Sequence, residues 1–387
     1  MVGEMYRETW VEINLDAIKH NITQIKEILP QETNIIAVVK ANAYGHGMVS
    51  VAKKALESGA TALAVAILEE AMILREASIN APILVLGYVP AKHAPLAARH
   101  NITLPIFQKK WLEELNQYQF EHPLNTHIKL DTGMGRIGIR STDELINLIK
   151  EIDNNKNIQL TGIFTHFATA DEKELVFYEE QIKRLEELLS IFKQHYTKDV
   201  TVHIGNSAAS LRFPESMHNS IRFGISMYGL YPSNDVRAEN RVELLPAFSL
   251  HSRLVHVKKI AKGDSISYGR TYIAEKDEWI GTVPIGYGDG WSRHLQGMSV
   301  LVNGRRMPIV GRICMDQLMI RLDEEIVIGT KVTLIGEQGN EIIEMDEVAD
   351  YLDTINYEVP CMINERVPRI YVENGKNSRG EIKNPKL

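Results

Sequence analysis

Eight short apolar runs, rich in β-branched residues and separated by amphipathic stretches, constrain the fold of this chain more than any other feature. The runs occupy residues 35–39, 62–66, 83–86, 102–104, 127–130, 162–165, 200–204 and 220–223. Helix-like segments lie between them at 16–29, 49–57, 69–76, 109–118, 143–152 and 171–195. Parallel strands need such crossover connections and are buried on both faces. The alternation therefore predicts an α/β fold, and the count of eight favours a (β/α)8 barrel of the TIM type over a doubly wound open sheet.

The first helix-like segment shows the amphipathic pattern most clearly. Its apolar residues, among them Ile18, Ile22 and Ile25, recur at helical spacing and define one face. Asp16 precedes this face and is the residue that we expect to cap the helix.

The pattern changes near residue 245, where short strand-like runs separated by turns replace the alternation. Runs at 250–260, 279–283, 307–310, 317–322 and 331–335 predict strands, and Asn303-Gly304 is typical of a tight hairpin turn. We therefore expect a barrel over residues 12–243 and a β-rich C-terminal domain formed by 1–11 and 244–372. The polar segment 373–387 is expected to be a flexible tail.

Composition excludes several classes of protein. The chain carries 43 basic and 50 acidic residues, and a net charge of −7 argues against a nucleic-acid-binding face. It contains no apolar run long enough to cross a membrane, and the polar start of the sequence leads us to expect no secretory signal. Two isolated cysteines suit the cytoplasm, where we expect the protein to act. The 13 histidines form no metal-binding motif, so no metal is expected.

Polar residues follow or end several of the predicted barrel strands, which is where barrel enzymes place their active sites. They are Lys40, Lys129, Arg136, His166, Asn206, Ser207 and Arg222. Lys40 is suited to form a Schiff base if it is desolvated, although a lysine at a strand end can also simply extend into solvent. Asn206 and Ser207 could bind phosphate at a helix start, or could be ordinary helix caps. The eighth run, with Arg222 and Gly224, offers further N–H groups for phosphate.

Taken together, these segments and others in the second half resemble bacterial alanine racemases over nearly the whole chain. The matching stretches are VKANAYGHG (39–47), KLDTGMGRIG (129–138), THFA (165–168), GNSA (205–208), RFG (222–224), SYG (267–269), GYGDG (286–290), MD (315–316), TINYE (354–358) and RVPR (366–369).

The resemblance implies an isomerase that interconverts L- and D-alanine with pyridoxal 5'-phosphate and supplies D-alanine for peptidoglycan. It implies a head-to-tail homodimer whose active sites each join one subunit's barrel to the other subunit's β domain. Lys40 and the partner subunit's Tyr268 would be the two bases acting on the external aldimine. Cofactor-binding residues would be Lys40, Tyr44, His166, Asn206, Ser207, Arg222, Gly224, Ile225 and Tyr357. Arg136 and Met315 would contact substrate, supported by Lys129, His203 and Asp316. In the family's manner, a carbamate on Lys129 would brace Arg136.

Three alternatives remain open from the sequence. A decarboxylase of the same fold would place an acidic residue at the pyridine nitrogen, where this chain offers Arg222. A non-catalytic carrier of pyridoxal phosphate would need no second domain. A racemase for serine or another amino acid is hard to separate from one for alanine, because one methylene in a pocket changes binding by only about 1–3 kcal/mol.

Overall fold

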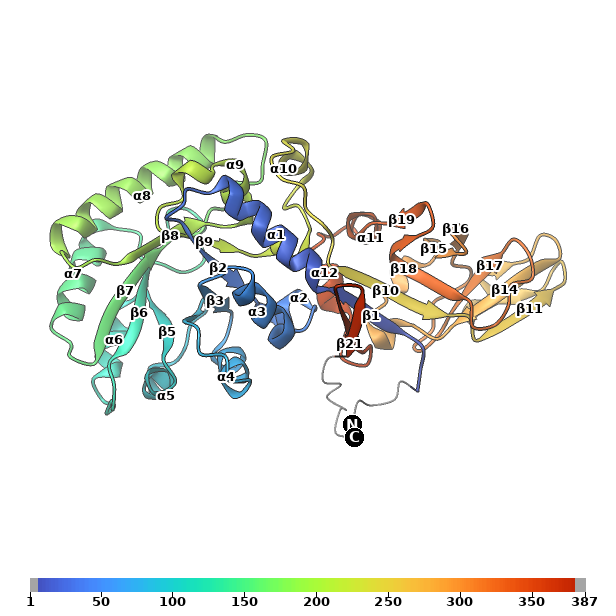
Figure 1. Cartoon of the computed structure of the whole chain (residues 1–387), viewed down its shortest axis with the longest axis horizontal. Helices are drawn as coiled ribbons and strands as arrows, with labels where there is room; N and C mark the ends of the chain where they lie inside the picture. The colour runs from blue at the N-terminus through green and yellow to red at the C-terminus, as the bar shows by residue number, and fades with distance from the viewer. Residues whose placement is uncertain (1–5, 380–387) are drawn as a thin grey trace. The chain divides into compact units, whose positions relative to one another are not determined.

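The computed structural model describes residues 6–379, and these divide into two compact units (Figure 1). One, here called the barrel unit, comprises residues 18–43 and 48–245. The other, the β-rich unit, comprises the described residues of 1–17, 44–47 and 246–387. The domain boundaries expected from the sequence stay a prediction. No helix in the described part of the chain is both long and apolar enough to cross a membrane.

The barrel unit is built on eight parallel strands that close into a ring in chain order. They are β2 (Asn34–Val38), β3 (Ala62–Val65), β4 (Ile83–Val85), β5 (Ile102–Ile106), β6 (Leu124–Lys129), β7 (Ile158–Phe164), β8 (Thr201–Gly205) and β9 (Ser220–Phe223). Pairing of Ile35 with Ile221 and of Ala37 with Phe223 joins the last strand to the first. This closure confirms the predicted barrel and excludes an open sheet.

Helices cover the outside of the barrel strands (Figure 1). They are α1 (Leu15–Ile28), α3 (Met48–Glu57), α4 (Leu68–Glu76), α5 (Ala94–Arg99), α6 (Lys109–Leu115), α7 (Thr142–Asp153), α8 (Val176–His195), α9 (Ser207–Arg212) and α10 (Asn234–Ala238). The predicted apolar face of α1 is confirmed, because Ile18, Ile22 and Ile25 are fully buried.

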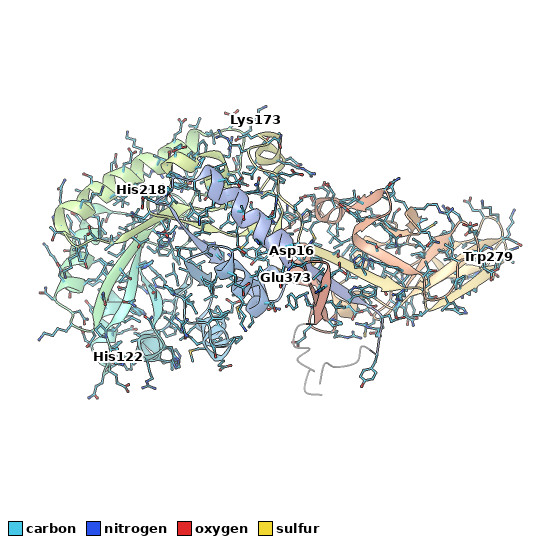
Figure 2. The ribbon with its side chains drawn as sticks, in the orientation of Figure 1. Asp16, His122, Lys173, His218, Trp279 and Glu373 are labelled. Carbon is cyan, nitrogen blue, oxygen red and sulfur yellow. The ribbon has the colours of Figure 1, made fainter. Side chains whose placement is uncertain are left out.

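The predicted cap of α1 is wrong by two residues. The side-chain oxygen of Asn14 accepts a hydrogen bond from the backbone N–H of Ala17 at 3.1 Å, so Asn14 caps the helix. Asp16 lies instead in the first turn, where its charge still favours the positive end of the helix. Its carboxylate accepts a hydrogen bond from the backbone of Asn374 at 2.6 Å, next to Glu373, which Figure 2 labels beside Asp16.

The β-rich unit is mainly strand, as predicted. One sheet has the order β16 (Arg305–Pro308), β15 (Ser299–Val302), β18 (Lys331–Gln338), β10 (Phe248–Arg253), β1 (Trp10–Asn14), β20 (Arg369–Glu373) and β21 (Lys376–Arg379), with β19 (Glu341–Ile343) paired to β18. A second contains β11 (His256–Ile260), β14 (Glu278–Val283) and β17 (Leu318–Leu322). A two-stranded hairpin pairs β12 (Ser265–Ile266) with β13 (Tyr272–Ile273). Two helices, α11 (Met345–Tyr351) and α12 (Glu358–Met362), complete it.

The single strand expected over 250–260 is wrong, because these residues form β10 and β11 in different sheets. The chain changes sheets between Leu254, whose N–H bonds Thr330, and Val255, whose N–H bonds Thr282. A run of apolar residues does not reveal such a change of partner.

Two Asn-Gly turns make hairpins in this unit. Asn303 and Gly304 have φ of 49° and 71° and join β15 to β16, which confirms the predicted turn. Asn374 and Gly375, with φ of 50° and 67°, join β20 to β21 in the same way. The segment expected to be a flexible tail from residue 373 therefore begins as a hairpin, and 380–387 lie outside the described residues.

Candidate functional site

Lys40 lies just beyond the carboxyl end of β2, at the start of a left-handed helical turn. Ala41, Asn42 and Ala43 have φ between 51° and 55° and ψ between 46° and 51°. Residues with a Cβ disfavour this conformation by about 1–2 kcal/mol each. Interactions of the turn offset part of that cost: the Asn42 side chain accepts from the N–H of Met48 at 2.8 Å. The turn thus sets where the backbone of Lys40 lies.

Glu70, in the first turn of α4, is the second support of this turn. One carboxylate oxygen accepts from the N–H of Ala41 at 2.6 Å, and the other accepts from the N–H of Ala66 at 2.8 Å. A single carboxylate therefore ties the end of β3 to the residue that follows Lys40. Sequence reasoning missed Glu70, because the residue at the cap position is Ile67 and the usual capping signature is absent.

Arg222, in β9, is the central charge of the barrel interior. It is only 4% exposed, and its guanidinium donates to the carbonyl oxygens of His203 and Thr165, at 2.7 Å each. Burial lowers the pKa of Arg222 to about 9, helped by the nearby charge of Arg136. The guanidinium therefore stays protonated at neutral pH and can only donate hydrogen bonds.

A chain of three histidines is ordered by Arg222. Its guanidinium lies 3.0 Å from Nδ1 of His203 and 3.2 Å from Nδ1 of His166. Because arginine only donates, both Nδ1 atoms must accept, so each neutral ring carries its proton on Nε2. Nε2 of His203 then donates to Nδ1 of His127 at 2.9 Å. A Cβ on Gly162 would lie 2.5 Å from the His127 ring, so a glycine there makes room for it.

All three histidines are neutral in this setting. Burial is the main cause of a lowered pKa in each, and the charge of Arg222 adds to it. The pKa of His127 falls to about 3. Lys129, Arg136 and Lys40 also lower the pKa of His166, which places these cations within electrostatic range of that ring.

Lys129, at the end of β6, is a buried amine without a hydrogen-bond partner among the described residues. It is 3% exposed, and its Nζ lies 4.8 Å from the centre of the Phe164 ring. Burial and the charges of Arg222 and Arg136 hold the pKa of Lys129 well below its ordinary value. Such an amine loses its proton more readily than an exposed lysine.

Arg136 is exposed on the loop that follows β6. The buried carboxylate of Asp131 folds this loop by accepting from the N–H groups of Gly133 and Gly135, at 3.1 and 2.9 Å. A bridge between Leu130 and Ile139 closes its base. The loop therefore presents Arg136 at the same end of the barrel as Lys129.

The segments after β8 and β9 lie against each other. The hydroxyl oxygen of Ser207 accepts from the N–H groups of Gly224 and Ser226, at 3.0 and 3.4 Å. The buried hydroxyl of Ser226 has no hydrogen-bond partner in the described part of the chain. Asn206 caps α9 by accepting from Ala209 at 3.0 Å, which is the alternative role considered for it. Ile225, next to Gly224, is buried.

Tyr44 and Tyr357 come together in the β-rich unit, with ring centres 6.3 Å apart. Burial raises the pKa of the Tyr44 phenol. Arg369 donates to the carbonyl oxygen of Gly45 at 3.0 Å. A Cβ on Gly45 would lie 2.1 Å from the carbonyl oxygen of Pro360, so this close approach requires glycine.

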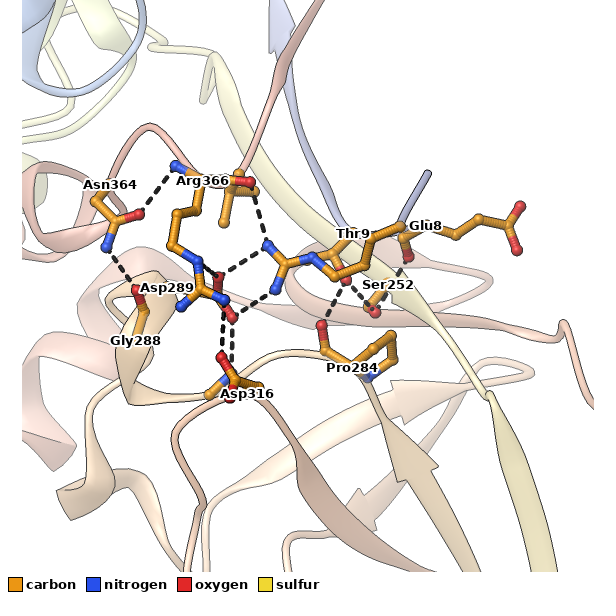
Figure 3. Close-up of polar contacts among 12 residues, drawn as sticks. Glu8, Thr9, Ser252, Pro284, Gly288, Asp289, Asp316, Asn364 and Arg366 are labelled. Carbon is orange, nitrogen blue, oxygen red and sulfur yellow. Dashed lines mark hydrogen bonds and ion pairs between the residues drawn. The ribbon is translucent and has the colours of Figure 1, made fainter. Parts of the chain in front are cut away.

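Tyr268, Met315 and Asp316 lie on two adjoining loops of the β-rich unit. Tyr268 is 70% exposed and Met315 is 54% exposed. The two loops are joined by the hydroxyl of Ser267, which donates to the carbonyl oxygen of Arg312 at 2.6 Å. Asp316 accepts from Arg366 at 2.7 Å, and Figure 3 shows this pair beside the buried carboxylate of Asp289.

The structure thus gathers the predicted barrel residues into one cluster at the strand ends, and the predicted second-domain residues into another set of loops. His127, Glu70 and Ser226 belong to the first cluster and were missed by sequence reasoning. No motif surrounds any of the three, so only their neighbours in space identify them. Among the described residues, no group of three or more His, Cys, Asp or Glu side chains could hold a metal ion.

Comparison with known proteins agrees with this arrangement. Residues 13–232 match the family described as alanine racemase, N-terminal domain, and residues 247–371 match alanine racemase, C-terminal domain. Alanine racemase 1 of Bacillus subtilis (strain 168) is 51% identical over 382 residues, which are 99% of this chain and 97% of that protein.

Solved structures extend the comparison. An alanine racemase from Bacillus anthracis with bound L-Ala-P is 51% identical, with a TM-score of 0.95, and the match covers 97% of this chain and 98% of that one. A histidine racemase from Leuconostoc mesenteroides subsp. sake is 32% identical, with a TM-score of 0.88 over 96% of this chain and 100% of that one. With both domains matched and near 50% identity over almost its full length, this chain belongs to the alanine racemase family.

Proposed function

We propose that this protein interconverts L- and D-alanine with pyridoxal 5'-phosphate as its cofactor. The observation that carries the proposal is that Lys40 follows β2 while the buried, donor-only cation Arg222 lies in the neighbouring barrel strand β9. Family membership supports the reaction, and the chemistry of the barrel residues supports the cofactor.

The residues of the barrel unit fit this cofactor. Lys40 would hold its aldehyde carbon, and Arg222 would donate to its ring nitrogen, backed by His203 and His166. The phosphate would be held by Ser207, Gly224 and Ile225, with Tyr44 and Tyr357, and with Asn206 ordering the helix start. The unpartnered buried hydroxyl of Ser226 suits an added acceptor at this place. When bound, pyridoxal phosphate supplies an electron-withdrawing ring that acidifies the α C–H bond of an attached amino acid.

Arg222 favours racemisation over the decarboxylase alternative. A carboxylate in its place could keep the ring nitrogen protonated, whereas a guanidinium cannot accept a proton. The cofactor ring would then withdraw electrons from the substrate less strongly, which would limit side reactions such as transamination. Neutral His203 and His166 accept from Arg222 and so orient the guanidinium without removing its charge.

Two bases on opposite faces would move the α-proton. Lys40 would act on the D-face, and the partner subunit's Tyr268 would act on the L-face. Removing a proton on one face and returning one on the other inverts the configuration, and general bases contribute most when their pKa lies near the working pH. The cations Arg136 and Arg222 are close enough to His166 to lower its pKa, and they contribute to the positive electrostatic potential of this site.

Arg136 would bind the substrate carboxylate, and Lys129 would hold Arg136 in place as a carbamate. A neutral amine is the form that reacts with carbon dioxide. The burial of Lys129, its lowered pKa and its lack of a hydrogen-bond partner in the described chain all support this modification. A carbamate would give Lys129 a negative charge that could form an ion pair with the Arg136 guanidinium.

The proposal includes a head-to-tail homodimer, in which the partner subunit's Tyr268, Met315 and Asp316 complete each site. The high exposure of Tyr268 and Met315 in the single chain agrees with a role in contact with a second copy. The proposed role is to supply D-alanine for peptidoglycan in the cytoplasm.

The main test is an assay of purified protein with L- and D-alanine, with and without added cofactor, followed by chiral analysis. Serine and histidine serve as competing substrates, because a related fold belongs to a histidine racemase. Lys40→Ala should abolish activity and the cofactor's visible absorbance, whereas Lys53→Ala, an exposed lysine of α3, should retain both. A Lys40→Ala protein that keeps a borohydride-trappable lysine adduct would contradict the assignment.

The shared site has its own test. Inactive Lys40→Ala and Tyr268→Phe proteins should regain activity when mixed, because one site of each heterodimer keeps both bases. Verified heterodimers without activity would place both bases in one chain.

A further inference from the structure

Ser267 has the most unusual backbone conformation in the exposed hairpin that carries Tyr268. Ser267 has φ of 66° and ψ of −176°, a region that is populated almost only by glycine. It is followed by Gly269 with φ of 72° and Arg270 with φ of 50°. A residue other than glycine keeps such a backbone conformation only where its surroundings stabilise it. Such residues cluster at functional sites.

The hydroxyl of Ser267 provides that constraint. It donates to the carbonyl oxygen of Arg312 at 2.6 Å and lies 3.5 Å from the sulfur of Cys314. If the backbone conformation alone were needed, glycine would adopt it without strain. The serine therefore adds something that glycine cannot, which is a hydrogen bond between the two loops.

Both ends of this hydrogen bond are firmly anchored in the β-rich unit. Ile266, next to Ser267, is buried in a small core with Ile280 and Val310. On the other side, a Cβ on Gly311 would lie 2.8 Å from the carbonyl oxygen of Ile266, so the two segments are in close contact. The carbonyl oxygen of Cys314 accepts from the N–H of Tyr287 at 3.1 Å.

The phenol of Tyr268, by contrast, is held by no hydrogen bond within the described part of the chain. Tyr268 is 70% exposed. Within one chain its direction therefore depends on its own backbone, which follows directly from Ser267.

We propose that Ser267 is a positioning residue for Tyr268, acting through its hydrogen bond to the Arg312 carbonyl. This inference rests on the proposed function, in which Tyr268 is the L-face base. Without the hydroxyl, the peptide before Tyr268 relaxes toward ordinary backbone conformations and the phenol leaves its working position.

The test uses Ser267→Ala, with Ser265→Ala as the matched control. Ser265 lies in the same hairpin, in the regular strand β12, where its hydroxyl accepts from Arg270 at 3.0 Å. In the described part of the chain it makes no bond to the Arg312 segment, so the control removes a different hydrogen bond of the same hairpin. Exchange of the α-proton with deuterated solvent is measured separately from L- and D-alanine. Loss of one neutral hydrogen bond predicts that Ser267→Ala slows exchange from L-alanine by about three- to tenfold. Exchange from D-alanine and the cofactor absorbance should stay within about twofold of the wild type. Both depend on Lys40 of the barrel unit, whereas the Ser267–Arg312 hydrogen bond lies in the β-rich unit.

A double-mutant cycle separates positioning from a general structural effect. In a Tyr268→Phe background, Ser267→Ala should cause no further loss, because its effect acts through the phenol. An equal loss in both backgrounds, or an equal loss from both enantiomers, would overturn the proposal. If the alanine variant fails to fold, Ser267→Gly replaces it. Glycine also lacks the hydroxyl and is free to leave this conformation, so the same loss from L-alanine is expected.

A second readout does not depend on activity. With 3-fluorotyrosine at position 268, the fluorine NMR resonance should shift or broaden in Ser267→Ala and not in Ser265→Ala. An unchanged resonance in Ser267→Ala would overturn the positioning role. If the resonance changes but Tyr268→Phe leaves L-alanine exchange intact, the proposed function fails while the positioning role stands.

Discussion

Replacing Asp289 by asparagine gives the sharpest test of how the loops of the β-rich unit are held. The Asp289 side chain is fully buried and accepts two hydrogen bonds from Arg7, at 2.9 and 2.8 Å, and one from the N–H of Gly286, at 3.1 Å. The Arg366 guanidinium lies 3.5 Å from the same carboxylate. Figure 3 shows the two side chains side by side. Asparagine keeps the volume and removes the charge.

The magnitude follows from these contacts. Asparagine retains one carbonyl oxygen, so at least one contact to Arg7 is lost, and hydrogen bonds to charged groups contribute about 1.5–3 kcal/mol each. Breaking a fully buried ion pair costs about 3–5 kcal/mol. Arg7 is 28% exposed and regains hydration, which lowers the expected cost. We expect Asp289→Asn to destabilise the loop by about 2–3 kcal/mol.

Hydrogen exchange measures this change locally. The N–H groups of Gly290 and Trp291 bond Tyr287 and Gly286, so their exchange reports opening of the Asp289 loop. A cost of that size predicts exchange roughly 30- to 150-fold faster, since each 1.4 kcal/mol is a factor of ten. An increase below about threefold would refute the reasoning, because the carboxylate would then contribute less than an ordinary hydrogen bond.

Asp316→Asn is the matched control. Asp316 pairs with Arg366 at 2.7 Å, but its side chain is 57% exposed. Exposed ion pairs contribute about 0–1 kcal/mol, so exchange of the same amides should rise by less than about fivefold. Equal effects of the two substitutions would mean that burial is not what makes Asp289 important.

Three further predictions concern the barrel unit. Burial lowers the pKa of His127 from 6.5 in the unfolded chain to about 3 in the folded protein. As pH falls from 6.5 toward 3, His127 therefore binds a proton in the unfolded state before it does so in the folded state, and the free energy of unfolding should fall. Urea unfolding across this range should show a smaller fall in His127→Gln, and an identical slope would contradict the burial argument. Glu70→Gln should speed exchange of the Ala41 amide by about tenfold, whereas Glu69→Gln on the exposed side of α4 should not. Carbon-13 NMR after labelling with bicarbonate should show a carbamate signal that Lys129→Gln removes, and a signal that persists in the variant would assign the modification elsewhere.

The barrel could be predicted from the sequence because its signal is local and repeated. Each strand is buried on both faces, which requires a short apolar run, and each crossover requires an amphipathic helix. The Asn303-Gly304 turn was equally readable, because two successive positive φ angles select those residues. The same rule holds for Asn374-Gly375, but the polar composition of residues 373–387 led to the prediction of a flexible tail, and this turn was missed. The predicted site residues at the strand ends rested on a family resemblance as well as on position.

Tertiary structure decided the features in which the partners are distant in sequence. His127 and His203 meet because β6 and β8 are alternate strands, whose inward side chains share one layer of a barrel. Glu70 supports the turn after Lys40 from 29 positions away. The strained backbone of Ser267 is accompanied by a hydrogen bond from its hydroxyl to the carbonyl oxygen of Arg312, 45 positions away. Sequence patterns report what each residue needs from its environment, namely burial, a turn or a helix face, and the fold alone determines which group supplies it.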